Sequence, residues 1–161
     1  MEIEGKFKVK DLKALRNKLA KLGIKEKTID HEENKLYDIF NILGRSRYIF
    51  RLRKTKQYFL TIKGPTKNSL VNSRKEYEFK IPKILYYILD FILPVKASYN
   101  KVRETYNPKK GISICLDKVL GLGYFVEIEA NDEKEVLLWK KKLGIKSKLI
   151  REPYFILVSN N

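Results

Sequence analysis

The first residues of the chain alternate between charged and uncharged side chains. Over residues 2–10 the charged side chains of Glu2, Glu4 and Lys6 fall on one face, and apolar or small residues fall on the other. A period of two residues is that of a β-strand, because successive side chains point to opposite sides of a sheet. The chain is therefore predicted to begin with a strand whose two faces differ.

Three later segments have the features of helices. Leucines recur at helical spacing between the predicted cap Asp11 and Gly23, and an amphipathic segment follows the cap Asp132. An apolar run follows Pro82. It is shorter than the roughly 20 residues needed to cross a bilayer, so we interpret it as a core helix. The predicted helices are 12–22, 83–92 and 132–143.

Turn residues divide the rest of the chain into extended segments. The connection at Thr55-Lys56 is so short that only an antiparallel hairpin can accommodate it. Other turn signals stand at Asn41–Gly44, Gly64-Pro65, Asn107-Pro108 and Gly121–Gly123. The predicted strands after 2–10 are 26–40, 46–54, 57–63, 71–80, 97–106, 112–118 and 123–130, and the apolar tail 150–158 is expected to dock.

Eight strands and three helices, with the strands mostly in meander order, predict an α+β fold. The expected architecture is a closed eight-stranded antiparallel β-barrel with helices packed on the outside. A length of 161 residues suits one domain, and no linker or repeat divides the chain. We therefore treat residues 1–161 as a single domain.

Pairs of like charges recur two positions apart on the predicted strands. Such neighbours lie roughly 7 Å apart on one face and repel unless opposite charge sits between them. If these faces line the interior of the barrel, an acidic and a basic cluster meet in a polar tunnel. Carboxylates there would bind Mg²⁺ or Mn²⁺, while Arg and Lys would bind phosphate oxygens. The pairs are Glu2 with Glu4, Arg51 with Arg53, Glu76 with Glu78, Lys101 with Arg103, and Glu127 with Glu129.

A solvated sheet face with cross-strand salt bridges is the alternative interpretation of these pairs. For one pair alone it is the simpler explanation, whereas five pairs in one small domain favour the tunnel. Glu76 and Glu78 are most readily explained as structural, since Arg74 and Lys75 stand beside them in the sequence.

The overall charge favours an anionic partner without naming it. The chain has 35 Lys and Arg against 19 Asp and Glu, a net charge of +16. Cys115 is the only cysteine and His31 the only histidine, so an internal disulfide and a Cys/His zinc cluster are excluded. We expect a cytoplasmic protein with no secretory signal and no membrane partner. A P-loop is excluded as well, because residues 64–67 lack the required spacing.

Six motifs occur in a fixed order along nearly the whole chain. They are EIEGK at 2–6, FRLR at 50–53, YFLTIKGP at 58–65, RKEYE at 74–78, KVRETY at 101–106 and CLDKVLGLGYFVEIEA at 115–130. In this order they resemble the CYTH superfamily, the triphosphate tunnel metalloenzymes, and within it the class IV adenylyl cyclase branch. The resemblance implies a tunnel that holds a metal-bound triphosphate.

The resemblance also implies roles for single residues. Glu2, Glu4 and Glu129 match the principal metal ligands, with Glu127 and Asp117 as further acidic positions, for one or two Mg²⁺ or Mn²⁺ ions. The residues that match triphosphate-binding groups are Lys6, Arg51, Arg53, Lys63, Arg74 and Arg103. Lys101 matches a lysine that activates water or assists the leaving group, and it forms the expected catalytic set with Glu4 and Glu129.

Two segments depart from the family pattern. Asn34–Asp38 stands where an Asp-Thr-Tyr-Phe-Asp-like segment is usual, which leaves open whether Tyr37 faces the tunnel as a partner of Lys101. Near the C-terminus, Pro153-Tyr154 replaces a Ser-Tyr pair, and the tyrosine is expected to keep its docking role. Arg151 is not expected to reach the tunnel.

Three functions follow from these observations. Hydrolysis of the terminal phosphoanhydride of inorganic tripolyphosphate, thiamine triphosphate or a nucleoside triphosphate is favoured, since the sequence shows no adenine-reading signature. A class IV adenylate cyclase would use the same metals and basic residues to convert ATP to cyclic AMP and pyrophosphate.

A non-enzymatic RNA- or polyphosphate-binding module is the third function, motivated by the charge of +16. Lysine-rich stretches such as 140–142 are more simply solvated helix faces, and the aromatic residues lack an RNA-stacking pattern. Nucleic acid is therefore not expected to be the main partner, and a homodimer stays open.

Overall fold

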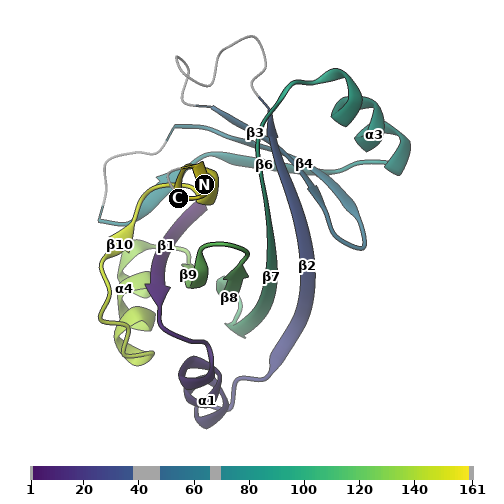
Figure 1. Ribbon diagram of the computed structural model, residues 1–161. Helices are drawn as coiled ribbons and strands as arrows, with labels where there is room; N and C mark the ends of the chain where they lie inside the picture. Colours follow the sequence, from purple (N-terminus) through teal and green to yellow (C-terminus); the bar gives the residue numbers. More distant parts are fainter. Residues whose placement is uncertain (1, 38–47, 66–69, 160–161) are drawn as a thin grey trace.

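A computed structural model describes residues 2–37, 48–65 and 70–159 of the chain, which contain ten strands and four helices (Figure 1). The strands are β1 (Glu2–Val9), β2 (Glu26–Tyr37), β3 (Ile49–Lys54), β4 (Tyr58–Lys63), β5 (Asn72–Arg74), β6 (Glu76–Lys80), β7 (Val95–Lys109), β8 (Ile112–Val119), β9 (Gly123–Glu129) and β10 (Leu149–Ile150). The helices are α1 (Lys13–Lys21), α3 (Lys83–Ile92), α4 (Glu133–Lys142) and α5 (Tyr154–Ser159). The predicted α+β class is confirmed.

The strands form one antiparallel sheet. Its order is β10-β1-β9-β8-β7-β2-β3-β4-β6, and β5 pairs with β1. The two long strands β2 and β7 lie side by side from Glu26 opposite Tyr106 to Tyr37 opposite Val95 (Figure 1). The predicted hairpin at Thr55-Lys56 is confirmed, since β3 and β4 pair along their whole length.

The prediction of a closed eight-stranded barrel is wrong, because the sheet does not close. Segment 71–80, predicted as one strand, forms two short strands that have different partners. β5 pairs with β1, whereas β6 pairs with β4, so the hydrogen bonding ends at β6. Lys75 alone separates β5 from β6. The chain itself therefore connects the two sides of the sheet, and the sheet still curves round an interior.

The main hydrophobic core lies on the outer face of this curved sheet, under α1 and α4. Phe7 of β1 packs in one cluster with Leu19 of α1 and Val136 of α4. Gly5 makes this close packing possible, because a Cβ there would lie 2.6 Å from Cγ1 of Val136. Since the small and apolar positions of β1 face the helices, its alternate positions, Glu4 among them, face the interior.

An aspartate stands at the start of both α1 and α4: the predicted cap Asp132 is confirmed, whereas the cap position of α1 is Leu12 and the prediction of Asp11 as its cap is wrong by one residue. The carboxylate of Asp132 accepts a hydrogen bond of 2.8 Å from the backbone N–H of Glu135. Asp11 stands one residue before the cap position of α1, yet its carboxylate accepts a 2.8 Å bond from the N–H of Lys13. Both side chains thus satisfy backbone donors in the first turn, the role expected of a cap.

Helix α3 covers a second, smaller core on the outside of the sheet. Tyr86 packs there with Tyr37, Leu52 and Ile81. The prediction of a core helix is wrong for most of α3: Tyr86 is its one buried residue, Leu89 packs partly buried against the same core, and Phe91 is exposed. A helix on the outside of a sheet buries only the side that faces the strands. Within the described residues, no helix combines the length and hydropathy that crossing a membrane requires.

Some element boundaries differ from the predictions. β7 runs on through the predicted turn at Asn107-Pro108, where a register shift against β8 accommodates a residue without an N–H. The tail docks as predicted, with β10 paired to β1 and α5 packed against the apolar side chains of Tyr99 and Phe125. The predicted turn Asn41–Gly44 and the adjoining strand ends lie outside the described residues.

Candidate active site

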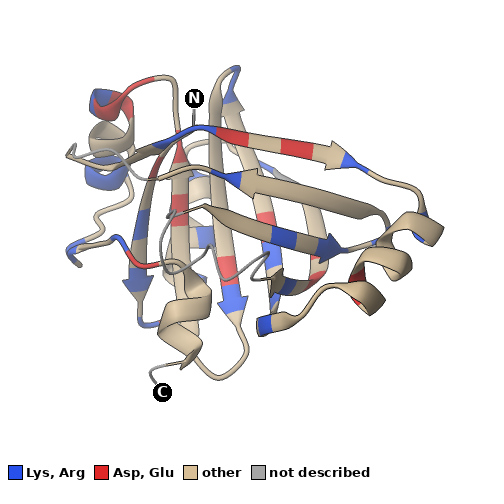
Figure 2. Ribbon diagram, turned by 90° about the horizontal axis from the view of Figure 1, so that it is seen from above, with Lys and Arg blue, Asp and Glu red and all other residues tan. Residues whose placement is uncertain are grey.

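Inward-facing side chains of the curved sheet surround a cavity of about 730 Å³. Every strand except β10 contributes residues to it, and charged bands alternate with uncharged positions along the ribbon (Figure 2). Ten of the twelve predicted site residues line this cavity. They are Glu4, Lys6, Arg51, Arg53, Lys63, Arg74, Lys101, Arg103, Glu127 and Glu129.

Three carboxylates meet on the wall formed by β1 and β9. Antiparallel pairing sets Glu4 directly opposite Glu129, with Glu127 two residues away on the same face. One oxygen from each of the three lies within 4.8 Å of the others. Glu4 and Glu127 are buried. Hard oxygen donors at this spacing suit Mg²⁺ or Mn²⁺, so the residues fit the predicted metal.

The two remaining predicted ligands differ from these three. Glu2 is placed on β1 by its backbone alone, opposite Arg74 of β5. Asp117 is fully buried on β8 and does not belong to the carboxylate group on β1 and β9. Its oxygens accept hydrogen bonds from Lys101 at 3.0 Å, from Arg103 at 2.7 and 2.8 Å, and from Tyr154 at 2.9 Å. These contacts favour a role in holding the cations.

Arg103 connects the basic and acidic parts of the cavity. Its guanidinium grips Asp117 with two hydrogen bonds and also contacts the carboxylate of Glu127. Burial alone would raise the pKa of Glu127, but the charges of Arg103, Lys101 and Lys6 outweigh it and hold that pKa well below its usual range. Glu127 is therefore ionised at neutral pH, the state that its predicted role as a metal ligand requires.

Arginine and lysine side chains of β3 and β4 form the opposite wall. Arg53 donates a 2.7 Å hydrogen bond to Glu78, and Lys63 lies 2.6 Å from Glu76. Arg51 lies between these glutamates, 3.7 Å from Glu76 and 3.5 Å from Glu78. Glu76 and Glu78 therefore line the cavity and are matched by cations from other strands, which corrects the expectation that residues beside them in the sequence neutralise them.

Glu32 is a buried carboxylate that is not among the predicted site residues. It lies 3.4 Å from Arg53, 3.6 Å from Lys101 and 4.0 Å from Arg103. Burial opposes its ionisation, but these three cations outweigh burial and hold the pKa of Glu32 at about 2. The sequence feature that could have indicated Glu32 is its position two residues before Asn34, because this spacing puts both residues on one face of the strand.

The C-terminal segment completes the cavity at Lys6. The ammonium of Lys6 donates a 2.5 Å hydrogen bond to the backbone carbonyl of Glu152 and lies 4.5 Å from the ring centre of Tyr154. Burial lowers the pKa of Lys6, while the carboxylates of Glu127 and Glu4 oppose that shift. Tyr154 packs against Tyr99 and Phe125 and thus docks as expected.

Two questions left open by the sequence are settled by position. Tyr37 faces outward under α3, where its hydroxyl donates a 2.6 Å hydrogen bond to Asp90, and Leu36 lines the cavity instead. Arg151 is exposed and does not line the cavity, as expected. Cys115 lines the cavity, but burial raises the pKa of its thiol to about 11, so it stays protonated at neutral pH.

Charges of both signs are balanced in the cavity. Among the described lining residues, seven are Lys or Arg and seven are Asp or Glu. A bare anion or a bare cation would leave one set unmatched, whereas a metal-bound polyanion brings charges of both signs. Nε of Arg51 and Nε of Arg53 are buried without an acceptor in the described part of the chain, so they remain as donors for such a ligand.

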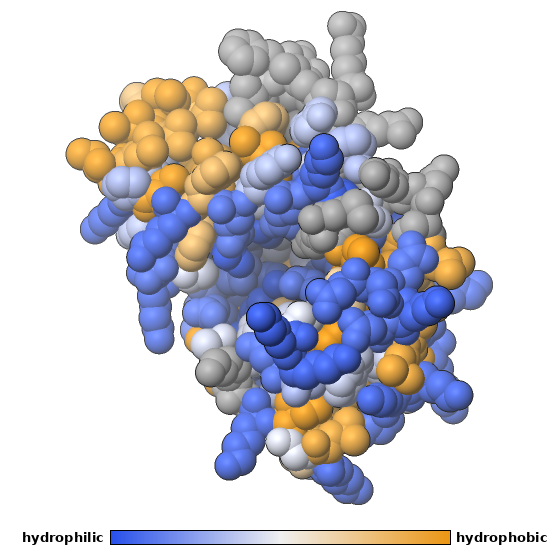
Figure 3. All heavy atoms as spheres, turned by 180° about the vertical axis from the view of Figure 1, so that it is seen from behind, coloured by the Kyte–Doolittle hydropathy of each residue, from blue (hydrophilic) through white to orange (hydrophobic). Residues whose placement is uncertain are grey.

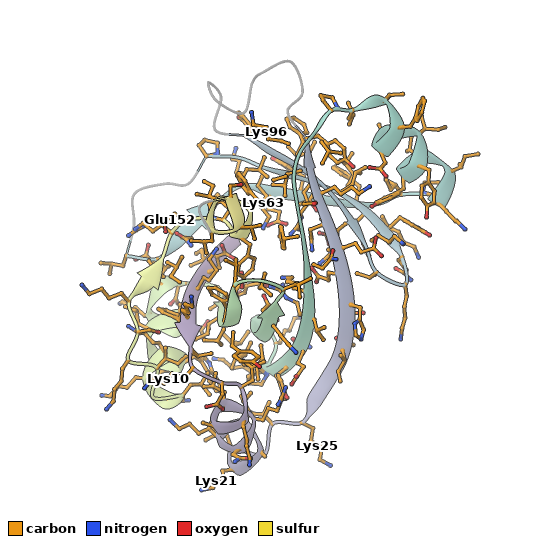
Figure 4. The ribbon with its side chains drawn as sticks, viewed as in Figure 1. Lys10, Lys21, Lys25, Lys63, Lys96 and Glu152 are labelled. Atoms are coloured by element: carbon orange, nitrogen blue, oxygen red, sulfur yellow. The ribbon has the colours of Figure 1, made fainter. Side chains whose placement is uncertain are left out.

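Lysines outside the cavity are distributed differently. Figure 4 shows Lys21 and Lys25 at the end of the molecule that carries α1, far from Lys63 of the cavity wall. Lys21 ends α1 and Lys25 lies just beyond it, and both side chains are exposed, which agrees with a solvated surface around the end of this helix. The structure thus separates the cations of the cavity from the general basic surface.

Comparison with known proteins places this geometry in a family. The CYTH domain model matches residues 1–152. A protein of Methanocaldococcus jannaschii, named "Putative adenylate cyclase MJ0240", is 31% identical over 98% of both chains.

Solved structures share the fold. The PH1012 protein from Pyrococcus horikoshii OT3 superposes with a TM-score of 0.82 at 23% identity, covering 98% of this chain and 99% of that one. HpAC1 from Hippeastrum, for which a dominant triphosphatase activity is described, superposes with a TM-score of 0.75 at 20% identity, covering 99% and 96%. At these identities the likeness concerns the fold.

Proposed function

Because this chain belongs to the CYTH domain family, we propose that it is a divalent-metal-dependent phosphohydrolase that cleaves the terminal phosphoanhydride of a triphosphate. The observation that carries the proposal is the cavity itself, in which three close carboxylates face a wall of Arg and Lys. Inorganic tripolyphosphate is the first substrate to test, since the lining shows strong features for phosphate and metal binding.

Glu4, Glu127 and Glu129 would hold the metal. A bound Mg²⁺ or Mn²⁺ would polarise a phosphoryl group and neutralise charge on the phosphate oxygens. Glu4 and Glu127 already have cationic partners, Arg74 and Arg103 respectively. When the carboxylates bind a cation, these guanidinium groups can turn to phosphate oxygens, which their planar fork matches.

Cations from several strands would position the triphosphate. Arg51, Arg53 and Lys63 lie on one wall, and Lys101 and Arg103 on another. Charge spreads over the phosphate oxygens in the transition state, so fixed cations stabilise it without having to reorganise. Their acidic partners, such as Glu76 and Glu78, keep the side chains in place before the substrate arrives.

Lys101 would act as a cation. Burial and the charge of Arg103 lower its pKa, but the carboxylates of Asp117 and Glu32 outweigh both, and its pKa lies above the usual value. A lysine that keeps its proton can stabilise a leaving phosphate or orient water, but cannot accept a proton. Lys101 therefore assists departure or positions water, and general-base chemistry is not its role.

Cyclisation of ATP is a second candidate. The Methanocaldococcus jannaschii relative carries the name of an adenylate cyclase and aligns with nearly the whole chain. A cavity of about 730 Å³ falls within the size range of small-molecule sites, so it has room for more than three phosphates. The same cations would serve attack on the α-phosphorus.

One substrate panel distinguishes these reactions. The purified chain is incubated with Mg²⁺ or Mn²⁺ and, in turn, with tripolyphosphate, thiamine triphosphate and ATP, and orthophosphate, pyrophosphate and cyclic nucleotide are measured separately. We expect orthophosphate and no cyclic nucleotide. Cyclic AMP and pyrophosphate without orthophosphate would favour the cyclase.

The absence of turnover with every triphosphate would overturn both enzymatic candidates. Salt-dependent RNA binding that survives Glu4→Ala, in a protein without turnover, would then favour a binding module. The panel and the binding assay together assign one of the three functions.

A further inference from the structure

Helix α3 exposes an apolar face that is large for a small monomer. Phe91 is 90% exposed, Ile84 is 72% exposed and Ile92 is 61% exposed. Leu85, Tyr87 and Ile88 on the same helix are also exposed. Figure 3 shows apolar atoms gathered at one corner of the molecule, which corresponds to the place of α3 in Figure 1 after the half turn. Contiguous patches of this kind mark interaction sites in soluble proteins.

The apolar surface continues from α3 onto the neighbouring strand. Phe79 of β6 is paired with Leu60 of β4, and Leu60 packs in the small core under α3. Side chains of paired residues share one face of a sheet, so Phe79, and Tyr77 two residues away, lie on the same outer face as α3. Both aromatic side chains are more than half exposed. The α3 patch is therefore defined as the exposed residues of α3 together with Tyr77 and Phe79.

The size of the α3 patch matches what a stable dimer requires. Its aromatic members bury roughly 150–250 Å² each when fully covered, so eight large, substantially exposed side chains offer on the order of 1,000 Å². A standard protein interface buries about 800 Å² on each partner. The patch also contains the aromatic residues that interface cores favour and few of the charged residues that they exclude.

The charges of α3 favour packing against a helix that runs in the opposite direction. Lys83 opens the helix and Asp90 lies near its end, whereas a helix dipole favours the reverse arrangement. Asp90 already pairs with Lys35 of the same chain. An antiparallel second α3 would bring Lys83 of each copy to the electronegative end of the other. The sequence of α3 is thus complementary to itself about a two-fold axis.

We propose that the α3 patch is the interface of a homodimer in which α3 packs antiparallel against α3 of a second copy. The interface covers the apolar residues that one chain leaves in water, and it places Ile88, near the middle of the ten-residue helix, close to the axis. Neither the active-site residues nor the C-terminal segment takes part. The proposal stands independently of the reaction that the cavity performs.

Sedimentation equilibrium tests the oligomeric state of the full chain. We expect twice the 19.1 kDa of one chain for the wild type and one chain mass for Phe91→Glu and for Ile84→Glu. Leu120→Glu is the matched control, because Leu120 is 71% exposed but lies in the turn between β8 and β9, and it should leave the dimer intact. Circular dichroism of each variant shows that the fold is retained.

Two further variants test the antiparallel arrangement. Lys83→Glu should raise the dimer dissociation constant at least tenfold, although it improves the match between α3 and its own dipole. Ile88→Cys should form an intermolecular disulfide under mild oxidation, and Leu120→Cys should not. The native Cys115 is buried and does not interfere.

Three results would overturn the proposal. The first is a wild-type chain that stays monomeric at every concentration, and the second is a dimer whose mass Phe91→Glu and Ile84→Glu leave unchanged. The third is a monomer that sediments with anionic lipid vesicles and loses that binding in Phe91→Glu, since the α3 patch would then bind lipid.

Discussion

Arg74 of β5 donates a hydrogen bond of 3.1 Å to Glu4 of β1, so a predicted phosphate-binding residue is paired with a predicted metal ligand. Both side chains are buried. The carboxylate of Glu4 and the guanidinium of Arg74 neutralise each other in the buried site. Glu4 therefore contacts both a predicted phosphate-binding group and the predicted metal position. Changes at Glu4 should therefore affect both.

The first prediction concerns the carboxylate trio. Glu4→Gln or Glu129→Gln removes one negative charge and one ligand while preserving side-chain shape. We expect triphosphate turnover to fall by about 10²–10³-fold, the range found when one group that stabilises transition-state charge is removed. Steady-state kinetics over a range of Mg²⁺ and Mn²⁺ concentrations measures the effect, and binding of Mn²⁺ alone should weaken in parallel.

Glu33→Gln is the control for these substitutions. Glu33 is exposed on β2 and pairs with Lys54 on the outside. It should retain wild-type turnover and wild-type Mn²⁺ binding. Equal loss in the control and the trio variants, or full activity in Glu4→Gln, would contradict the assignment of the metal site.

The second prediction concerns Glu32. Its carboxylate lies among Arg53, Lys101 and Arg103, so Glu32→Gln leaves buried cations without part of their counter-charge. Removing one partner of a buried ion pair costs about 3 kcal/mol in the free energy of unfolding. Urea denaturation measures this, and Glu33→Gln should change it by less than about 0.5 kcal/mol.

Glu32 should also make stability depend on pH in the acid range. Its pKa is held at about 2 in the folded protein, against an ordinary value of 4.5. A lowered folded-state pKa stabilises the protein above the unfolded pKa, and this contribution is lost as the pH falls from about 4.5 towards 2. The difference in unfolding free energy between wild type and Glu32→Gln should shrink over this window. A difference that stays constant from pH 6 to pH 2.5 would argue against the ion pairs.

Most of the candidate site can be predicted from the sequence because its residues alternate along strands. Glu4, Lys6, Arg51 and Arg53 share faces at a two-residue period, and this period alone turns them toward the interior. The cap Asp132 could be predicted as well, because its carboxylate accepts a hydrogen bond from a residue only three positions away. Local pattern thus fixes which way a side chain points.

Other features depended on partners that are distant in sequence. Asp117 could be counted as an acidic residue, but only the fold shows that Lys101, Arg103 and Tyr154 occupy its oxygens. The division of 71–80 into two strands could not be predicted for the same reason. Each half pairs with a different strand that is remote in the sequence. The sheet was therefore predicted to close where it does not.

The third prediction concerns Lys101. Its raised pKa keeps the ammonium charged, so Lys101→Met removes a cation from the buried cluster and should lower kcat by about 10²-fold or more. Lys101→Arg keeps the charge and should recover part of the activity. Lys118→Met, at an exposed position of β8, should match the wild type. Lower activity in Lys101→Arg than in Lys101→Met would show that charge is not what this position supplies.

The last prediction concerns Gly5, which stands between Glu4 and Lys6 in the first motif. A Cβ at this position would lie 2.6 Å from Cγ1 of Val136, a fully buried residue of α4, and 2.9 Å from two ring atoms of Phe7. Gly5→Ala should therefore cost about 1–3 kcal/mol in the free energy of unfolding and lower turnover, because β1 must shift.

A double-mutant cycle separates this crowding from a general intolerance of alanine in β1. Val136→Ala removes the closest of these contacts and leaves the ring of Phe7, so Gly5→Ala with Val136→Ala should be more stable than the sum of the two single effects predicts, and should regain part of the activity. Gly23→Ala serves as the control: its φ of 73° is unfavourable for alanine, yet no atom lies within 4 Å of its Cβ position. It should lose about 1 kcal/mol of stability with unchanged turnover. Strict additivity in the cycle would mean that the contact with Val136 does not explain the need for glycine at this position.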